Sequence, residues 1–153
     1  MEDLYRMPGH LVRRVQQIAS ALFLDECGSF DLTSVQFAAL KAIQSHPRID
    51  ATRLSSLIAI DRSTLGSVLE RLEKKGWVVR SSSPTDKRTK LLSLSPEGRE
   101  VLKQVIPAVR RVQKRLVAPL AANDQDKIVQ LLHQIAEAYN DLLPAPIHAA
   151  SLD

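Results

Sequence analysis

Residue types that carry covalent or metal chemistry are scarce in this sequence. It has one cysteine, which rules out an internal disulfide framework, and four histidines, none with a partner at the spacing of a zinc site. Its five glycines do not cluster into a phosphate-binding loop. Since no Ser/His/Asp or Cys/His nucleophilic set can be argued either, we expect no catalytic residues, no metal site and no cofactor.

Long apolar stretches are also missing. No run approaches the ~20 residues that a bilayer-spanning helix needs, and the acidic start Met1–Leu4 lacks the basic and apolar regions of a signal peptide. The 153 residues are 44% hydrophobic and 25% charged, as in soluble globular proteins. We therefore expect a cytoplasmic protein with no membrane association, built as one domain or one tight two-part unit.

Positive charge gathers in the middle of the chain. The net charge is +4, and the segment from Arg48 to Lys90 holds ten Lys/Arg against five Asp/Glu, so the remaining chain is close to neutral. A basic middle between near-neutral ends favours a central DNA-contacting lobe flanked by elements with another task.

The segment from Asp61 to Gly76 reads as one amphipathic helix. Asp61 is suited to cap its first turn, and Gly76 to follow its last turn in a left-handed conformation. The apolar face holds Leu65, Val68, Leu69 and Leu72, and the opposite face holds Arg62, Ser63, Ser67, Arg71 and Lys74. Such a helix suits the DNA major groove, although a solvated charged face is the ordinary alternative.

A basic hairpin follows this helix. Segments 77–80 and 91–94 have strand composition, and the polar loop between them is rich in turn formers. The tip of the loop carries Lys87 and Arg88, with Lys90 beside it. A helix followed by a hairpin with a cationic tip is the plan of a winged helix, whose tip can reach the DNA minor groove.

The run from Asp86 to Gly98 resembles the wing signature of the MarR (multiple antibiotic resistance regulator) family, in which Asp-x-Arg and a strand precede Leu-Thr-x-x-Gly at the start of a long helix. The resemblance extends from about Leu4 to Leu143, with two departures: Ser83 stands where an acidic residue is common, and Ser95 replaces the usual Thr. It implies a mainly α fold with a small β-hairpin wing. Residues 31–98 would form the winged helix-turn-helix lobe, and residues 1–30 and 99–153 a helical dimerisation region.

The other helices follow from apolar periodicity. We expect helices over 4–27 with a regular start near Pro8, over 34–46, over a short stretch from about Asp50 to Ile58, over 96–120 with a kink at Pro107, and over 124–143. The Pro- and Ala-rich tail from Pro144 to Asp153 is expected to be mobile or an arm. The long terminal helices have narrow apolar stripes that would pack against another helix. We therefore expect a second copy of the chain to supply that helix in a homodimer.

The expected DNA contacts divide by type. We expect Arg62, Ser63, Thr64, Ser67 and Arg71 near base edges and adjacent phosphate. We expect Arg88 in the minor groove, with its guanidinium oriented by Asp86. Phosphate contacts are expected from Lys74, Lys87 and Lys90, and from Thr52, Arg53 or Ser55 on the preceding helix. A two-fold dimer would read a palindromic site with half-sites about 34 Å apart.

The resemblance further implies a repressor that a small aromatic acid releases from DNA. Candidate effector-binding residues are His10, Arg13 and Arg14, with Phe30, Phe37 and Leu40 nearby in sequence, because a cation beside apolar walls suits an aromatic carboxylate. The alternative for each is a solvated cation or a core aromatic residue. We expect Cys27 to be a buried or incidental thiol.

Two other functions stay open at this point. One is a DNA-binding protein without an effector, and the other is a helical protein-interaction module whose basic middle meets an acidic partner. The second predicts no sequence preference for DNA, so binding to the upstream region of its own gene against scrambled DNA separates the two.

Overall fold

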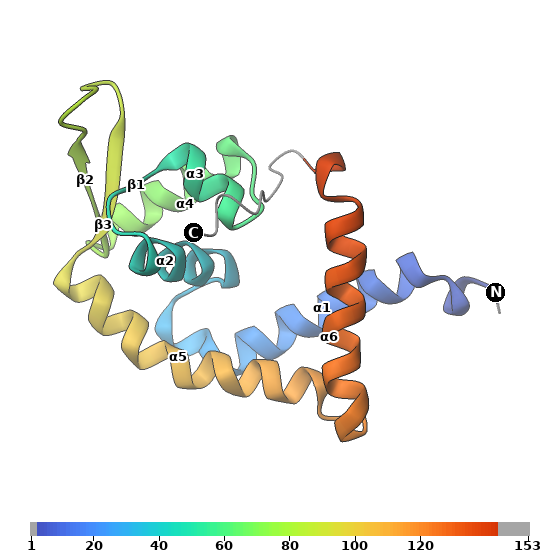
Figure 1. Ribbon diagram of the computed structural model, residues 1–153. Coiled ribbons are helices and arrows are strands. Elements are labelled where there is room, and N and C mark those ends of the chain that lie inside the picture. Colours follow the sequence, from blue (N-terminus) through green and yellow to red (C-terminus); the bar gives the residue numbers. More distant parts are fainter. Residues whose placement is uncertain (1–2, 144–153) are drawn as a thin grey trace.

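The computed structural model describes residues 3–143, which form a mainly helical molecule with one small antiparallel sheet (Figure 1). The predicted fold class is confirmed, whereas the predicted tail from Pro144 to Asp153 lies outside the described residues. The elements in chain order are η1 (Leu4–Arg6), α1 (Pro8–Cys27), η2 (Gly28–Phe30), α2 (Ser34–Ser45), β1 (Ile49–Asp50), α3 (Ala51–Leu57), α4 (Arg62–Lys74), β2 (Val78–Ser82), β3 (Lys90–Leu94), α5 (Pro96–Val117), α6 (Ala122–Ala138) and η3 (Asn140–Leu142).

Short polar side chains start most of the helices. Thr33 forms a reciprocal capping box with Gln36 at the start of α2, while Asp50 caps α3 and Asp61 caps α4. Ser95 caps α5, whose first residue is a proline. The helix starts near these residues are therefore confirmed, but α5 ends at Val117 rather than at Leu120, and α6 covers 122–138 rather than 124–143.

The core lies where α2, α3 and α4 meet the sheet and the first half of α5. Its largest fully buried side chains are Leu40, Ile43, Leu54, Leu65, Leu69, Leu72, Leu92, Leu102 and Val105. Burial of side chains of this size contributes about 1.5–3 kcal/mol each, so packing against this core holds α4 in place.

The sheet has one strand that the sequence did not predict. Its order is β1-β3-β2, with Val78 opposite Leu94 in the hairpin and Ile49 opposite Leu92 on the other side of β3. Because β1 supplies only two residues, no alternation could reveal it. The pairing of β1 with β3 attaches the segment just before α3 to the wing hairpin.

The junction between α4, the wing and α5 is closely bonded. The Ser95 backbone N–H donates to the Trp77 carbonyl at 3.0 Å, and the Ser95 hydroxyl donates to the Gly76 carbonyl at 2.5 Å. The same hydroxyl oxygen accepts from the Gly98 N–H at 2.9 Å. Gly76 has a φ of 73°, so a glycine suits this left-handed position after α4. The end of α4 and the start of α5 are thus held together by one serine.

The terminal helices leave the lobe on one side. Helices α1 and α5 pack together, and three ion pairs join them: Arg111–Glu26 at 2.8 Å, Arg115–Glu26 at 2.9 Å and Arg115–Asp25 at 2.5 Å. Helix α5 continues through Pro107, and α6 then turns away at a steep angle (Figure 1). None of the residues 122–138 that form α6 is buried. Within residues 3–143, no helix is both long enough and apolar enough to cross a membrane.

Candidate nucleic-acid interface

Helix α4 presents a polar face to solvent. Leu65, Leu69 and Leu72 are at most 2% exposed and anchor the helix in the core. The six polar residues of α4 that the sequence assigned to DNA are all exposed: Arg62, Ser63, Thr64, Ser67, Arg71 and Lys74. The face therefore has the accessibility that a groove contact requires.

The first turn of α4 is fixed by Asp61. Its carboxylate accepts from the Thr64 backbone N–H at 2.8 Å and from the Thr64 hydroxyl at 2.7 Å. These bonds, first the hydroxyl and then the backbone bond, lower the pKa of Asp61, so the cap stays charged at neutral pH. Because the Thr64 hydroxyl hydrogen is already donated to Asp61, this side chain remains available to DNA chiefly as an acceptor and through its methyl group.

The two helices of the helix-turn-helix touch through polar side chains. The Arg62 guanidinium donates to the Thr52 hydroxyl of α3, which joins two residues predicted to contact DNA. The turn between them closes with a 3.0 Å bond from the Ile60 N–H to the Ser55 carbonyl, and Ala59 takes a φ of 54°. The first residue of α4 is therefore oriented from α3.

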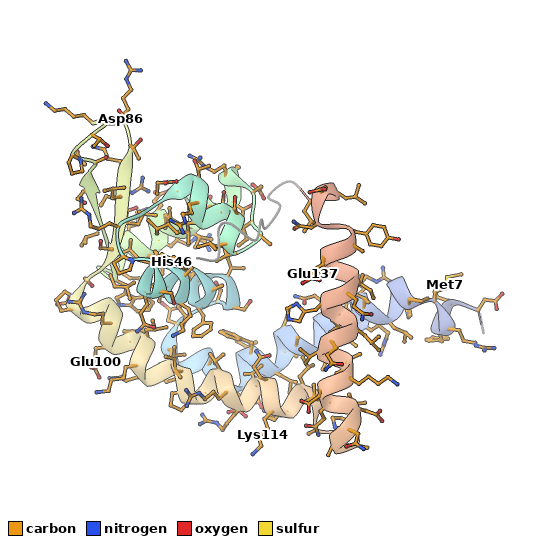
Figure 2. All side chains as sticks on the ribbon, viewed as in Figure 1. Met7, His46, Asp86, Glu100, Lys114 and Glu137 are labelled. Carbon is orange, nitrogen blue, oxygen red and sulfur yellow. The ribbon has the colours of Figure 1, made fainter. Side chains whose placement is uncertain are left out.

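The wing tip is organised by Asp86, although not as the sequence suggested. We expected its carboxylate to pair with the Arg88 guanidinium. Instead it accepts from the Arg88 backbone N–H at 2.9 Å and from the Thr89 hydroxyl at 3.2 Å. The carboxylate thus fixes the loop backbone and leaves the Arg88 side chain to extend from an exposed tip. Figure 2 shows the loop around Asp86 projecting beyond the helices.

A cationic hollow lies between α3, the start of α4 and the wing. It has a volume of about 720 Å³, and it brings together five residues predicted to bind DNA: Thr52, Arg53, Arg62, Arg88 and Lys90. Ser56 and Arg80 line it as well, and Asp50 is the single carboxylate in the lining. The sequence prediction missed Arg80, which sits on β2 and pairs with Glu73 of α4 at 2.5 Å. Its position in a strand gives no signal, because the strand pattern of residues 77–80 rests on their apolar side chains.

The residues proposed for an effector do not meet within one protomer. His10, Arg13 and Arg14 lie in the first turns of α1, whereas Phe30 lies past its other end. At 1.5 Å per residue, α1 separates His10 from Cys27 by about 25 Å. Leu40 is fully buried in the core, so in this conformation it offers no surface to a ligand. Phe37 and Phe30 are half-buried against the same core.

The His10 end of α1 nevertheless forms a small cluster. The Arg13 guanidinium lies 3.2 Å from His10 Nδ1, and the Tyr5 ring meets the imidazole edge-on at 5.6 Å between centroids. The His10 Nε2 atom is shielded and has no partner within the described residues. A cation and an unpaired ring nitrogen are thus present together, but no apolar wall from η2 or α2 is near them.

Known proteins resemble this chain in both sequence and fold. A family model described as "MarR family" matches residues 32–90, which cover α2 through the start of β3. The transcriptional regulator HosA of Escherichia coli O157:H7 is 31% identical over 126 residues, which are 82% of this chain and 92% of HosA. The chain belongs to the MarR family. It is a DNA-binding transcriptional regulator of the MarR type.

Two solved structures extend this likeness to nearly the whole MarR fold. The transcriptional repressor CouR, solved on a 23-mer DNA duplex, has a TM-score of 0.83 and 29% identity, covering 88% of this chain and 95% of CouR. BpsR of Bordetella bronchiseptica, whose DNA binding is regulated by 6-hydroxynicotinic acid, has a TM-score of 0.82 and 28% identity, covering 85% and 93%.

Cys27 and the possible metal ligands of this MarR chain can be compared with what thiol or metal chemistry requires. Cys27 is fully buried, and burial, followed by the nearby Glu26 charge, raises its pKa, which disfavours the reactive thiolate. Among residues 3–143, no group of three or more His, Cys, Asp or Glu side chains could hold a metal ion.

Proposed function

We propose that this MarR protein is a homodimeric repressor that binds palindromic DNA. In this proposal α4 enters the major groove and the Arg88 wing enters the adjacent minor groove. The cationic hollow between α3, α4 and the wing carries the proposal. Its lining holds five Lys/Arg side chains against one carboxylate, as a surface that follows a phosphate backbone requires. The repressor CouR, a structural neighbour, is itself bound to a DNA duplex.

The homodimer is supported by apolar surface on the terminal helices. Residues 31–98 would form the DNA-binding lobe, and residues 1–30 and 99–153 the dimerisation region. Large apolar side chains at both ends of the described chain are 39% or more exposed, and those near the N-terminus are Leu4, Tyr5, Met7, Leu11, Val12, Val15 and Ile18. Those near the C-terminus are Leu120, Val129, Leu131, Leu132, Ile135, Tyr139, Leu142 and Leu143. Apolar surface on this scale is typical of an obligate interface, and a second copy offers the matching surface.

The proposed effector is a small aromatic carboxylate. The Arg13–His10 pair and the unpaired His10 nitrogen favour an anion at the start of α1, and the DNA binding of the neighbour BpsR responds to an aromatic acid. Because α1 keeps His10 far from Phe30 and Phe37 in one protomer, a single site using both would combine α1 of one copy with the lobe of the other.

Two experiments test these proposals separately. A gel shift with the upstream region of its own gene is expected to give a complex that scrambled DNA does not displace and that weakens steeply with salt. Equal competition by scrambled DNA would remove the sequence-specific function. In a thermal-shift screen of aromatic acids, His10→Ala should lose the response of the wild type, while Lys41→Ala, on the exposed face of α2, should keep it. A response that survives in His10→Ala would exclude this histidine.

A further inference from the structure

We infer that Gly66 of the recognition helix α4 is a specificity-determining residue, against whose exposed backbone a thymine methyl group packs in the DNA major groove. The inference rests on the function proposed above, in which α4 enters that groove. It adds a base preference that the cationic hollow does not explain, because the lysines and arginines that line the hollow suit phosphates, which carry no sequence information.

Gly66 is a glycine that the fold does not require. It lies inside α4, where glycine destabilises a helix relative to alanine. Beyond its own helix backbone and chain neighbours, no atom lies within 4 Å of the position that a Cβ atom would take. By contrast, Gly76 has a left-handed φ, and a Cβ atom on Gly98 would collide with the Trp77 carbonyl. The reason for a glycine at position 66 therefore lies in what α4 binds.

The surroundings of Gly66 place it on the DNA-facing side of α4. Arg62, which lines the cationic hollow, lies four positions before it, so the two residues are neighbours on the helix surface. Ser63, Gly66 and Ser67 are all exposed, and none of them has a side chain longer than a hydroxymethyl group. The backbone of α4 can thus approach a partner surface more closely here than at Arg71 or Lys74.

The surface at Gly66 offers no hydrogen bond to a partner. The N–H and C=O of this residue both fall within the hydrogen-bond pattern of α4, which leaves the Cα methylene as the group that faces outward. A polar base edge placed against it would lose water without gaining a partner. The apolar group that bases present in the major groove is the C5-methyl of thymine. Thymine is therefore the base that fits this position.

A methyl group at position 66 would take the space of the thymine methyl. Gly66→Ala adds a Cβ atom at the contact, and the two methyl groups would then compete for one volume. Deoxyuridine pairs as thymidine does but lacks the C5-methyl, so it makes room for the alanine. A purely structural role for Gly66 would give no such dependence on the DNA base.

The test compares two proteins on two DNAs. The full-length wild type and Gly66→Ala are titrated by fluorescence anisotropy with the upstream DNA, prepared with either thymidine or deoxyuridine. On thymidine DNA, Gly66→Ala should bind at least about fivefold more weakly than the wild type, as expected for one lost base contact. On deoxyuridine DNA the two proteins should bind equally. The salt dependence should not change, because no charge is altered, and urea unfolding should show that Gly66→Ala is folded.

Arg88→Ala is the matched control. It should also weaken DNA binding, but its proposed contact lies in the minor groove, away from the thymine methyl, so its loss should be the same on both DNAs. An undiminished affinity of Gly66→Ala for thymidine DNA overturns the inference, and so does an equal loss on the two DNAs. Both results leave the proposed function standing if the wild type prefers the upstream DNA to scrambled DNA. Without that preference, the proposed function fails and the inference fails with it.

Discussion

The carbonyl oxygen of Trp77 occupies the space into which a Cβ atom on Gly98 would project. Gly98 lies in the first turn of α5 and is buried, and its N–H is bonded to the Ser95 hydroxyl that also holds the end of α4. This contact gives a physical reason for the glycine that ends the wing signature. Only a residue without a side chain lets α5 start directly against Trp77, which lies between α4 and β2.

Gly98→Ala should destabilise the protein by about 3 kcal/mol, since a backbone carbonyl and a helix start cannot both move aside. Gly66→Ala is the matched control. Gly66 lies inside α4 with open space around its Cβ position, so alanine there should stabilise by about 0.5–1 kcal/mol. Urea unfolding of both variants gives the comparison. Equal effects at the two positions would show that the Trp77 contact imposes no constraint.

Arg62→Ala should weaken binding to the upstream DNA by about 1–3 kcal/mol, because it removes a charged side chain at the start of the recognition helix. Thr52→Val should cost less, since it keeps the shape and removes only the acceptor of the Arg62 bond. If Thr52 acts by orienting Arg62, the double variant should be no weaker than Arg62→Ala. Fluorescence anisotropy measures all three affinities, and strictly additive losses would mean that the two residues act separately.

Arg88→Ala should also weaken DNA binding by about 1–3 kcal/mol, as the loss of one groove contact. Asp86→Asn keeps Arg88 but disturbs the bonds that fix its backbone, so a smaller loss is expected. Lys87→Ala is the control, because a phosphate contact should change the salt slope by about one and leave the sequence preference unchanged. An unchanged affinity of Arg88→Ala would remove the wing from the mechanism.

Acid should weaken the ion pairs between α1 and α5. The hydrogen bonds from Arg111 and then Arg115 lower the pKa of Glu26 below its ordinary value of 4.5. A group with a lowered folded-state pKa stabilises the fold above its unfolded pKa and loses this contribution as the pH falls through the folded value. The stability gap between the wild type and Glu26→Gln should thus be constant near neutral pH and close below about pH 4.5. Denaturant unfolding at a series of pH values measures it, with Glu137→Gln on α6 as the control that should show no such gap.

The parts of the fold that the sequence predicted well depend on local chemistry. Asp61 and Ser95 cap helices through bonds to residues three positions ahead, and Gly76 follows α4 in a conformation that suits glycine. Such features are contained in a few neighbouring residues. The exposure of the six polar residues on α4 follows in the same way, because one helical period places them opposite Leu65 and Leu69.

The missed features join distant segments. The pairing of Ile49 with Leu92 and the ion pair between Glu26 and Arg111 bring together residues more than forty positions apart. The effector candidates show the same dependence on tertiary structure. Helix α1 separates His10 from Phe30, and the core encloses Leu40, neither of which sequence neighbourhood reveals. Asp86 showed a third limit, because its spacing from Arg88 did not reveal whether the backbone or the guanidinium would be its donor.

Hydroxyl-radical footprinting on the upstream DNA most directly tests whether two copies of the chain bind one DNA duplex as a symmetric dimer. The account predicts two symmetric protected segments about one helical turn apart, each flanked by minor-groove protection from a wing. The flanking protection should disappear in Arg88→Ala while the central segments remain. A single unsymmetrical footprint, or flanks that persist without Arg88, would contradict the account.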